Sequence, residues 1–177
     1  FSALSDTENE DLGMSRFLCS QTVAISMKGI PAVFFHSLCG TPNDLKGYQE
    51  TKRNRTVNRK KWKQDELEQI LDDQSTMPAE IFQWYSRVLR MRAGCPAFHP
   101  DAPQEILQLG NSVFALRRDS LDGGLSVFCL FNFKAEKTEI NKMDSLHSIF
   151  PSEKARDLIS GGEINWTDSG VLALRPY

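Results

Sequence analysis

Histidine and cysteine are scarce in this sequence, and neither is spaced as a metal site requires. The three histidines and four cysteines lie far apart, without a CxxC pair, which argues against a zinc site. Scattered cysteines within apolar stretches are typical of buried structural thiols in a reducing compartment. We therefore expect a cytoplasmic protein without a metal or organic cofactor.

Strong net charge and long apolar runs are missing as well. A formal net charge of -2 gives no general attraction to nucleic acid or to an anionic membrane. No apolar run approaches the ~20 residues of a membrane helix, and the opening Phe-Ser-Ala-Leu lacks the features of a signal peptide. We therefore predict neither a nucleic-acid nor a membrane partner, and we interpret the start of the chain as internal.

The first hundred residues have the pattern of an α/β domain. Apolar positions predict a helix over 14–28, and the continuous apolar run Ile30–Phe35 predicts a strand buried on both faces. Further helices are expected over 64–74 and 78–93. Between the strand and these helices lies a long polar segment, 36–61, and loops of this length in compact domains commonly carry function.

After residue 100 the apolar pattern has a period of two, which is typical of β-strands. Strands are predicted over 113–117, 125–131, 163–166 and 171–175, with Asp122-Gly-Gly124 as a hairpin turn. The predicted fold class is thus α/β then β. We place an α/β part at 1–100 and a small antiparallel β domain at 101–177.

Short segments of the first hundred residues follow one another in a characteristic order: Arg16–Gln21, Gly29–Leu38, Leu89–Arg92 and Pro96–Pro100. Between them, the polar loop carries Gly40, Asn43-Asp44, Thr51, Arg53, Arg55 and Asn58-Arg59. Together they resemble the sucrose phosphorylase subfamily of glycoside hydrolase family 13, in the α-amylase clan. The loop is most similar to the glucosylglycerate phosphorylase branch, although Lys52 stands where that branch usually has Gly.

The resemblance implies that residues 1–100 are the last part of a (β/α)8 TIM barrel with an active-site loop at 36–61, and that 101–177 are its C-terminal β domain. It also implies a retaining α-glucosyl phosphorylase. Such an enzyme cleaves a sucrose-like or glucosylglycerate-like α-glucoside with inorganic phosphate to give α-glucose 1-phosphate. The Asp nucleophile, Glu acid/base and stabilising Asp of the family would precede Phe1. We therefore assign no catalytic residue and expect this chain, as a C-terminal fragment, to be inactive in isolation.

Substrate-binding residues are expected in the polar loop, because barrel active sites lie at the C-terminal ends of the strands. Position and resemblance together predict the following substrate-binding set: His36, Asn43, Asp44, Arg55 and Arg59. Planar guanidinium groups suit this role, since they bind phosphate through two hydrogen bonds at once.

Other functions stay open at this point. A hydrolase or transglucosylase of the same clan would use water or a sugar in place of phosphate, and a non-catalytic carbohydrate-binding remnant is a further alternative. The basic residues between 46 and 63 could also form a solvated surface or a nucleic-acid patch. Acidic residues in 6–11 and 65–73 offset that charge, which argues against nucleic acid. The sequence selects neither the acceptor sugar nor an oligomeric state.

Overall fold

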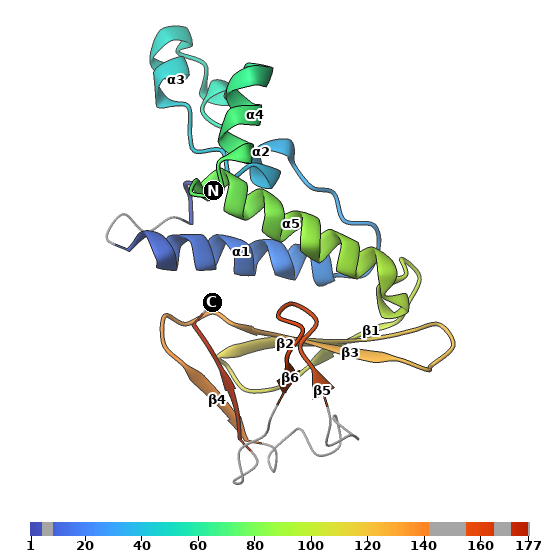
Figure 1. The fold of residues 1–177 in the computed structure, drawn as a ribbon. Coiled ribbons are helices and arrows are strands. Elements are labelled where there is room, and N and C mark those ends of the chain that lie inside the picture. The colour runs from blue at the N-terminus through green and yellow to red at the C-terminus, as the bar shows by residue number, and fades with distance from the viewer. Residues whose placement is uncertain (5–8, 142–154, 165–170, 177) are drawn as a thin grey trace. The chain divides into compact units, whose positions relative to one another are not determined.

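The computed structural model describes residues 1–4, 9–141, 155–164 and 171–176. Helices come first along the chain and strands follow (Figure 1). The helices are α1 (Glu10–Ser26), α2 (Phe35–Leu38), α3 (Leu45–Thr51), α4 (Gln64–Asp72) and α5 (Met77–Gly94), with 3-10 turns η1 (Asn54–Thr56) and η2 (Pro96–Phe98). The strands are β1 (Gln104–Leu107), β2 (Val113–Asp119), β3 (Ser126–Asn132), β4 (Thr138–Asn141), β5 (Ala155–Arg156), β6 (Glu163–Ile164) and β7 (Val171–Leu174).

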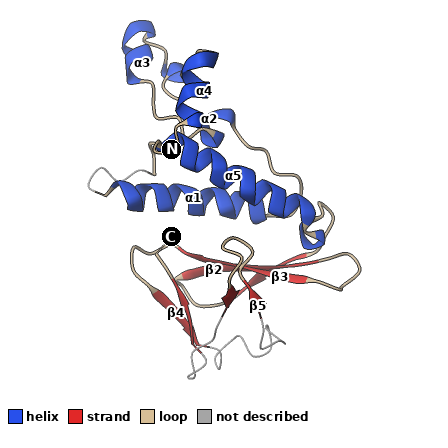
Figure 2. Ribbon diagram, in the orientation of Figure 1, coloured by secondary structure: helices blue, strands red, loops and turns tan. Residues whose placement is uncertain are grey.

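The chain forms two compact units whose segments alternate along the sequence. The first unit consists of Phe1–Leu18 and Pro31–Arg90, and the second of Cys19–Ile30 and Met91–Tyr177. The first holds the polar loop that we predict to bind substrate. The second holds the described strands (Figure 2). The assignment of 1–100 to a barrel and 101–177 to a separate β domain stays a prediction.

The three predicted helices are confirmed, and capping side chains explain where two of them begin. Helix α1 begins at Glu10 because the side chain of Asn9 accepts a hydrogen bond from the backbone N–H of Leu12 at 3.0 Å. Helix α5 begins at Met77, after Thr76, whose hydroxyl accepts from the N–H of Ala79 at 3.3 Å. These caps satisfy N–H groups that the first turn of a helix leaves without a partner.

The predicted buried strand over Ile30–Phe35 is wrong. Residues 30–34 form no strand, and Phe35 begins the short helix α2. Ile30 is 84% exposed, and Phe34 and Phe35 are about half exposed. A strand depends on hydrogen bonds to a neighbouring strand, and the described residues place none beside this segment. The loop over 36–61 contains no strand, as predicted, but it does contain α2, α3 and η1.

The strands in the described part of the chain are antiparallel, as predicted, and they form three separate sheets. The sheets have the strand orders β1-β2-β3, β4-β7 and β5-β6. Strands predicted over 113–117, 125–131 and 171–175 are confirmed as β2, β3 and β7. The one predicted over 163–166 is described only for Glu163–Ile164, because residues 165 and 166 lie outside the described part. Strands β1, β4 and β5 were not predicted.

The hairpin turn between β2 and β3 forms at the predicted Asp122-Gly-Gly124. Oδ1 of Asp122 accepts hydrogen bonds from the hydroxyl of Ser120 at 2.5 Å and from the N–H of Gly124 at 3.0 Å. Gly123 has a φ of 71°, a conformation that favours glycine over any residue with a Cβ. The turn therefore depends on both the carboxylate and the glycine that follows it.

Two buried arginines of the second unit cap the end of α1. Arg92 donates to the carbonyls of Ile25, Met27 and Gly29, the last at 2.7 Å. Its guanidinium lies 5.2 Å from the ring centre of Phe98. The last carbonyls of a helix lack partners within it, and a cation suits the negative end of the helix dipole. Arg92 supplies both the donor and the charge.

Arg118 of β2 completes this cap and has no exposed surface. Its guanidinium lies 5.6 Å from the ring centre of Phe98, which places both arginines beside one aromatic ring. It donates to the backbone carbonyls of four residues: Ser26 at 3.0 Å, His99 at 3.0 Å, Pro103 at 3.3 Å and Ala102 at 3.4 Å. One side chain thus holds the end of α1, the turn η2 and the start of β1 together.

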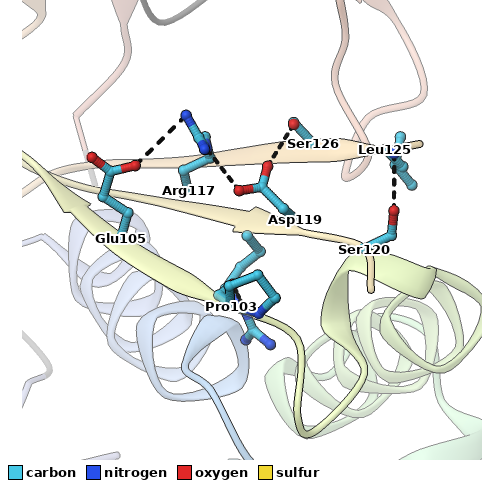
Figure 3. A network of polar contacts seen from close by, with 8 residues as sticks. Pro103, Glu105, Arg117, Asp119, Ser120, Leu125 and Ser126 are labelled. Carbon is cyan, nitrogen blue, oxygen red and sulfur yellow. Dashed lines mark hydrogen bonds and ion pairs between the residues drawn. The ribbon is translucent and has the colours of Figure 1, made fainter. Parts of the chain in front are cut away.

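The neighbouring Arg117 is directed to the other face of the sheet, as the alternation of side chains along a strand requires. It makes ion pairs with Glu105 at 3.6 Å and with Asp119 at 2.9 Å (Figure 3). Asp119 also accepts a hydrogen bond from the hydroxyl of Ser126 at 2.6 Å. This network links β1, β2 and β3 on the more exposed face.

Candidate functional site

His36, the first predicted binding residue, lies on the short helix α2 at the start of the polar loop. Its ring contacts Phe34 and Phe35 edge-on, with ring centres 5.1 and 5.3 Å apart. Nδ1 of the imidazole is enclosed and has no hydrogen-bond partner among the described residues. Burial lowers the pKa of His36 and the positive charge of Arg59 lowers it further, so the neutral imidazole is favoured.

The influence of Arg59 on His36 shows that the structure brings these two predicted residues together. Arg59 follows η1, and its backbone N–H donates to the carbonyl of Thr56 at 3.0 Å. Its side chain is exposed and makes no hydrogen bond or ion pair with any described residue. A cation therefore stands near a neutral imidazole, with its donors available to a ligand.

Asp44 and Asn43 are held by local structure. Asp44 is the N-cap of α3, where its Oδ1 accepts from the N–H of Gly47 at 2.8 Å. Its own N–H donates to the carbonyl of Val57 at 2.6 Å, which ties α3 to the end of η1. The backbone N–H of Asn43 donates to the hydroxyl of Ser2 at 2.9 Å, and the side chain of Asn43 is exposed. Asp44 thus has a clear structural role in addition to its predicted one.

Arg55 lies on η1 with an exposed side chain, and it makes no hydrogen bond or ion pair with the other predicted binding residues in the described part of the chain. Much of the remaining basic stretch is either exposed or already paired. Lys60 lies 3.5 Å from the ring centre of Trp62, and Lys63 pairs with Glu66 at 3.4 Å. Of the cations in this stretch, the structure links Arg59 alone electrostatically to His36, as far as the described residues show.

Lys52 adopts the left-handed conformation, with a φ of 55°, at the C-cap of α3. It is the only described residue other than glycine with a positive φ. Left-handed φ angles favour glycine, because a Cβ approaches the following carbonyl oxygen. The backbone at this position therefore suits the Gly that the resembled branch usually has there, although this chain carries Lys.

Two residues that sequence reasoning did not select, Thr41 and Trp62, join the two ends of the loop. The indole N–H of Trp62 donates to the hydroxyl of Thr41 at 3.1 Å. The N–H of Thr41 in turn donates to the carbonyl of His36 at 2.8 Å. A Trp that follows a run of cations was the available signal, but nothing in the sequence indicates its partner.

The thiols have the properties of structural groups. All four cysteines are free, and burial raises the pKa of Cys19 and Cys39. Burial also raises the pKa of Cys129 to about 12. Among the described residues, no group of His, Cys, Asp and Glu could hold a metal ion, and no helix is long and apolar enough to cross a membrane.

Comparisons with known proteins assign the family. No family model matches the chain. A glucosylglycerate phosphorylase from Allomeiothermus silvanus is 42% identical over 135 residues, covering 75% of this chain and 24% of the relative. One from Spirochaeta thermophila is 38% identical over 117 residues, covering 66% and 20%. One from Escherichia coli is 31% identical over 176 residues, covering 99% and 29%.

The chain thus spans 20–29% of the length of these relatives. The crystal structure of AmyP in complex with maltose has a similar fold, with a TM-score of 0.65 at 14% identity, over 99% of this chain and 35% of that one. The resemblance predicted from the loop is confirmed by the relatives. The chain belongs to the sucrose phosphorylase-like subfamily of glycoside hydrolase family 13, in the branch of the glucosylglycerate phosphorylases.

Proposed function

We propose that the protein containing this chain is a retaining α-glucosyl phosphorylase that cleaves a glucosylglycerate-like α-glucoside with inorganic phosphate, giving α-glucose 1-phosphate. The observation that carries the proposal is the match of this chain to three glucosylglycerate phosphorylases at 31–42% identity. Residues 1–100 would then be the last part of a (β/α)8 barrel.

The chemistry of such an enzyme requires two carboxylates, neither of which we assign to this chain. One forms a covalent glucosyl-enzyme, and the other, about 5 Å away, alternates as acid and base. In the second step phosphate takes the position that water holds in a hydrolase. We propose that both carboxylates, with a third that stabilises the transition state, lie in the part of the protein before Phe1.

The contribution of this chain is the binding of substrate and phosphate by the loop. Arg59 would contact the phosphate or the glucosyl group, and His36 would hydrogen-bond a sugar hydroxyl or the acceptor. Arg59 is exposed with free donors, and the neutral state of His36 lets its ring act as both donor and acceptor. Asn43, Asp44 and Arg55 would contact the acceptor from further along the loop.

The proposal is tested with the full-length protein, glucosylglycerate as substrate, and product analysis with and without inorganic phosphate. We expect glucose 1-phosphate to form only when phosphate is present. Release of glucose at an equal rate without phosphate would instead identify a hydrolase, and no turnover at all would favour a binding protein. Sucrose, tested in parallel, decides between the two acceptor classes.

A pair of variants then tests the role of Arg59. Arg59→Lys keeps the charge but loses the planar fork, so we expect the KM for phosphate to rise about tenfold. Arg87→Lys is the matched control, because Arg87 is exposed on α5, outside the loop. An equal change of the KM for phosphate in the two variants would show that Arg59 does not bind the phosphate.

A further inference from the structure

A chain of two hydrogen bonds connects the end of the loop to His36. The indole N–H of Trp62 donates to the hydroxyl of Thr41 at 3.1 Å, and the N–H of Thr41 donates to the carbonyl of His36 at 2.8 Å. Thr41 is only 7% exposed, so water competes little for these bonds. The two partners lie on either side of α3 and η1 in the sequence, and their bond closes the whole loop at its base.

Both residues of this link are themselves held in place. Gly40, next to Thr41, has a φ of 56° and packs so closely on Ile81 of α5 that a Cβ there would collide with Cδ1 of Ile81. Ile81 is completely buried, which fixes the start of the loop against the helix. The ammonium group of Lys60 lies 3.5 Å from the ring centre of Trp62, an arrangement that orients the indole.

Arg59 is placed by the same link, because it lies between the bond of Asp44 to Val57 and the anchored indole of Trp62. The N–H of Asp44 donates to the carbonyl of Val57 at 2.6 Å, and Trp62 is fixed on Thr41. A chain held on both sides of a residue restricts where that residue can move. The spacing between the His36 ring and the Arg59 guanidinium therefore depends on the Thr41–Trp62 bond.

We propose that Thr41 and Trp62 are positioning residues of the substrate site, whose hydrogen bond sets the distance between His36 and Arg59. This inference rests on the proposed function, and it assigns a role to two residues outside the predicted binding set. Neither residue contacts substrate. Both act through His36 and Arg59, by keeping the loop in the geometry that binds the phosphate.

The test uses the full-length protein, four single variants and two combinations of substitutions, with steady-state kinetics in glucosylglycerate and inorganic phosphate. Thr41→Val replaces the hydroxyl with a methyl group of the same size, and Trp62→Phe keeps an aromatic ring for Lys60 while removing the donor. We expect each to raise the KM for phosphate about fivefold, the loss of one hydrogen bond, with kcat within about twofold of wild type. Thr41→Ser keeps the hydroxyl, so we expect this variant to have the wild-type KM for phosphate.

A fourth variant, Trp84→Phe, is the matched control, because Trp84 lies on α5 and contacts Tyr85 edge-on at 5.3 Å, outside the loop. We expect it to leave the KM unchanged. The double variant Thr41→Val with Trp62→Phe should equal either single variant, since both break one bond. In an Arg59→Lys background, Thr41→Val should raise the KM by less than twofold, because the residue through which it acts is already impaired.

The outcomes separate this inference from the function on which it rests. A wild-type protein that forms no glucose 1-phosphate with phosphate overturns both. A wild-type enzyme with the expected product, but with an unchanged KM in Thr41→Val and in Trp62→Phe, overturns the inference alone. Equal losses in Thr41→Val and Thr41→Ser, or a fall in kcat with an unchanged KM, would also contradict a positioning role.

Discussion

Arg117 and Arg118 are adjacent in β2, and the structure predicts very different costs for the same substitution at the two sites. Arg118 is fully buried, and its guanidinium donates to four backbone carbonyls, two of them at 3.0 Å. Arg117 has 37% of its side chain exposed and pairs with the carboxylates of Glu105 and Asp119. Replacement of each by Met removes the charge and keeps a long side chain.

The magnitudes follow from what each replacement leaves behind. Arg118→Met leaves buried carbonyls without donors, which lowers the free energy of unfolding by about 1–3 kcal/mol for each of the two short bonds. Burial of the apolar Met side chain offsets part of this loss. We expect a net loss of about 3 kcal/mol. Arg117→Met removes ion pairs in contact with solvent, which contribute at most about 1 kcal/mol. The difference between neighbours should therefore exceed about 2 kcal/mol.

Hydrogen exchange followed by mass spectrometry measures this difference locally. Peptides that cover 19–30 and 99–107 report the opening of the segments that Arg118 joins. Arg118→Met should speed amide exchange in these peptides more than tenfold. Arg117→Met should change the exchange rate less than about fivefold. Equal effects at the two positions, or a larger effect at 117, would refute the view that these carbonyl contacts hold the end of α1.

Three further predictions concern the loop. Gly40→Ala should destabilise the protein by about 2–4 kcal/mol in denaturant titration, since Gly40 has a φ of 56° and its new Cβ would collide with Ile81; a loss below 1 kcal/mol would contradict the packing. Lys52→Gly should stabilise by about 0.5–1 kcal/mol, because Lys52 is strained at a φ of 55°; a lower melting temperature would exclude this strain. Arg59→Gln should raise the pKa of His36, measured by NMR titration, but not to its ordinary value, because burial remains. The lowered pKa of His36 gives a stability that is present above its ordinary pKa and is lost as the pH falls below it, so this variant should lose less stability in mild acid.

The helices were predictable because their signals are local. Apolar spacing marked α1 and α5, acidic residues in the first turn marked α4, and the side chains that cap α1 and α5 are next to them in sequence. The strand predicted over Ile30–Phe35 failed for the opposite reason. A continuous apolar run indicates that a segment can be buried in a sheet, but the strands that would bury it must come from elsewhere. Strands β1 and β4 were missed because each is four residues long and depends on its partner.

The site was predictable only as a list of candidates. The sequence placed many cations in one stretch, and the resemblance selected Arg55 and Arg59 among them, but nothing in the sequence indicates which side chains they lie near. In the structure Lys60 lies against Trp62, whereas the positive charge of Arg59 lowers the pKa of His36. His36 and Arg59 are 23 positions apart in the sequence, so no spacing rule reveals that they interact. The hydrogen bond of Trp62 to Thr41 was not predicted either, because the two residues are 21 positions apart in the sequence.

The lowered pKa of His36 bears on how the proposed phosphorylase would hold phosphate. A phosphate dianion must approach a site that already contains catalytic carboxylates, so cations are needed nearby. A neutral His36 adds no positive charge; burial lowers its pKa most, and Arg59, the residue that we propose meets the phosphate, lowers the pKa of His36 further. Charge and hydrogen bonding would then be divided between the two residues. Arg59 would offset the charge of the phosphate. The imidazole would form hydrogen bonds with sugar hydroxyls and would not compete with Arg59 for the phosphate. In a hydrolase the guanidinium of Arg59 would have no such role, because the attacking water carries no charge.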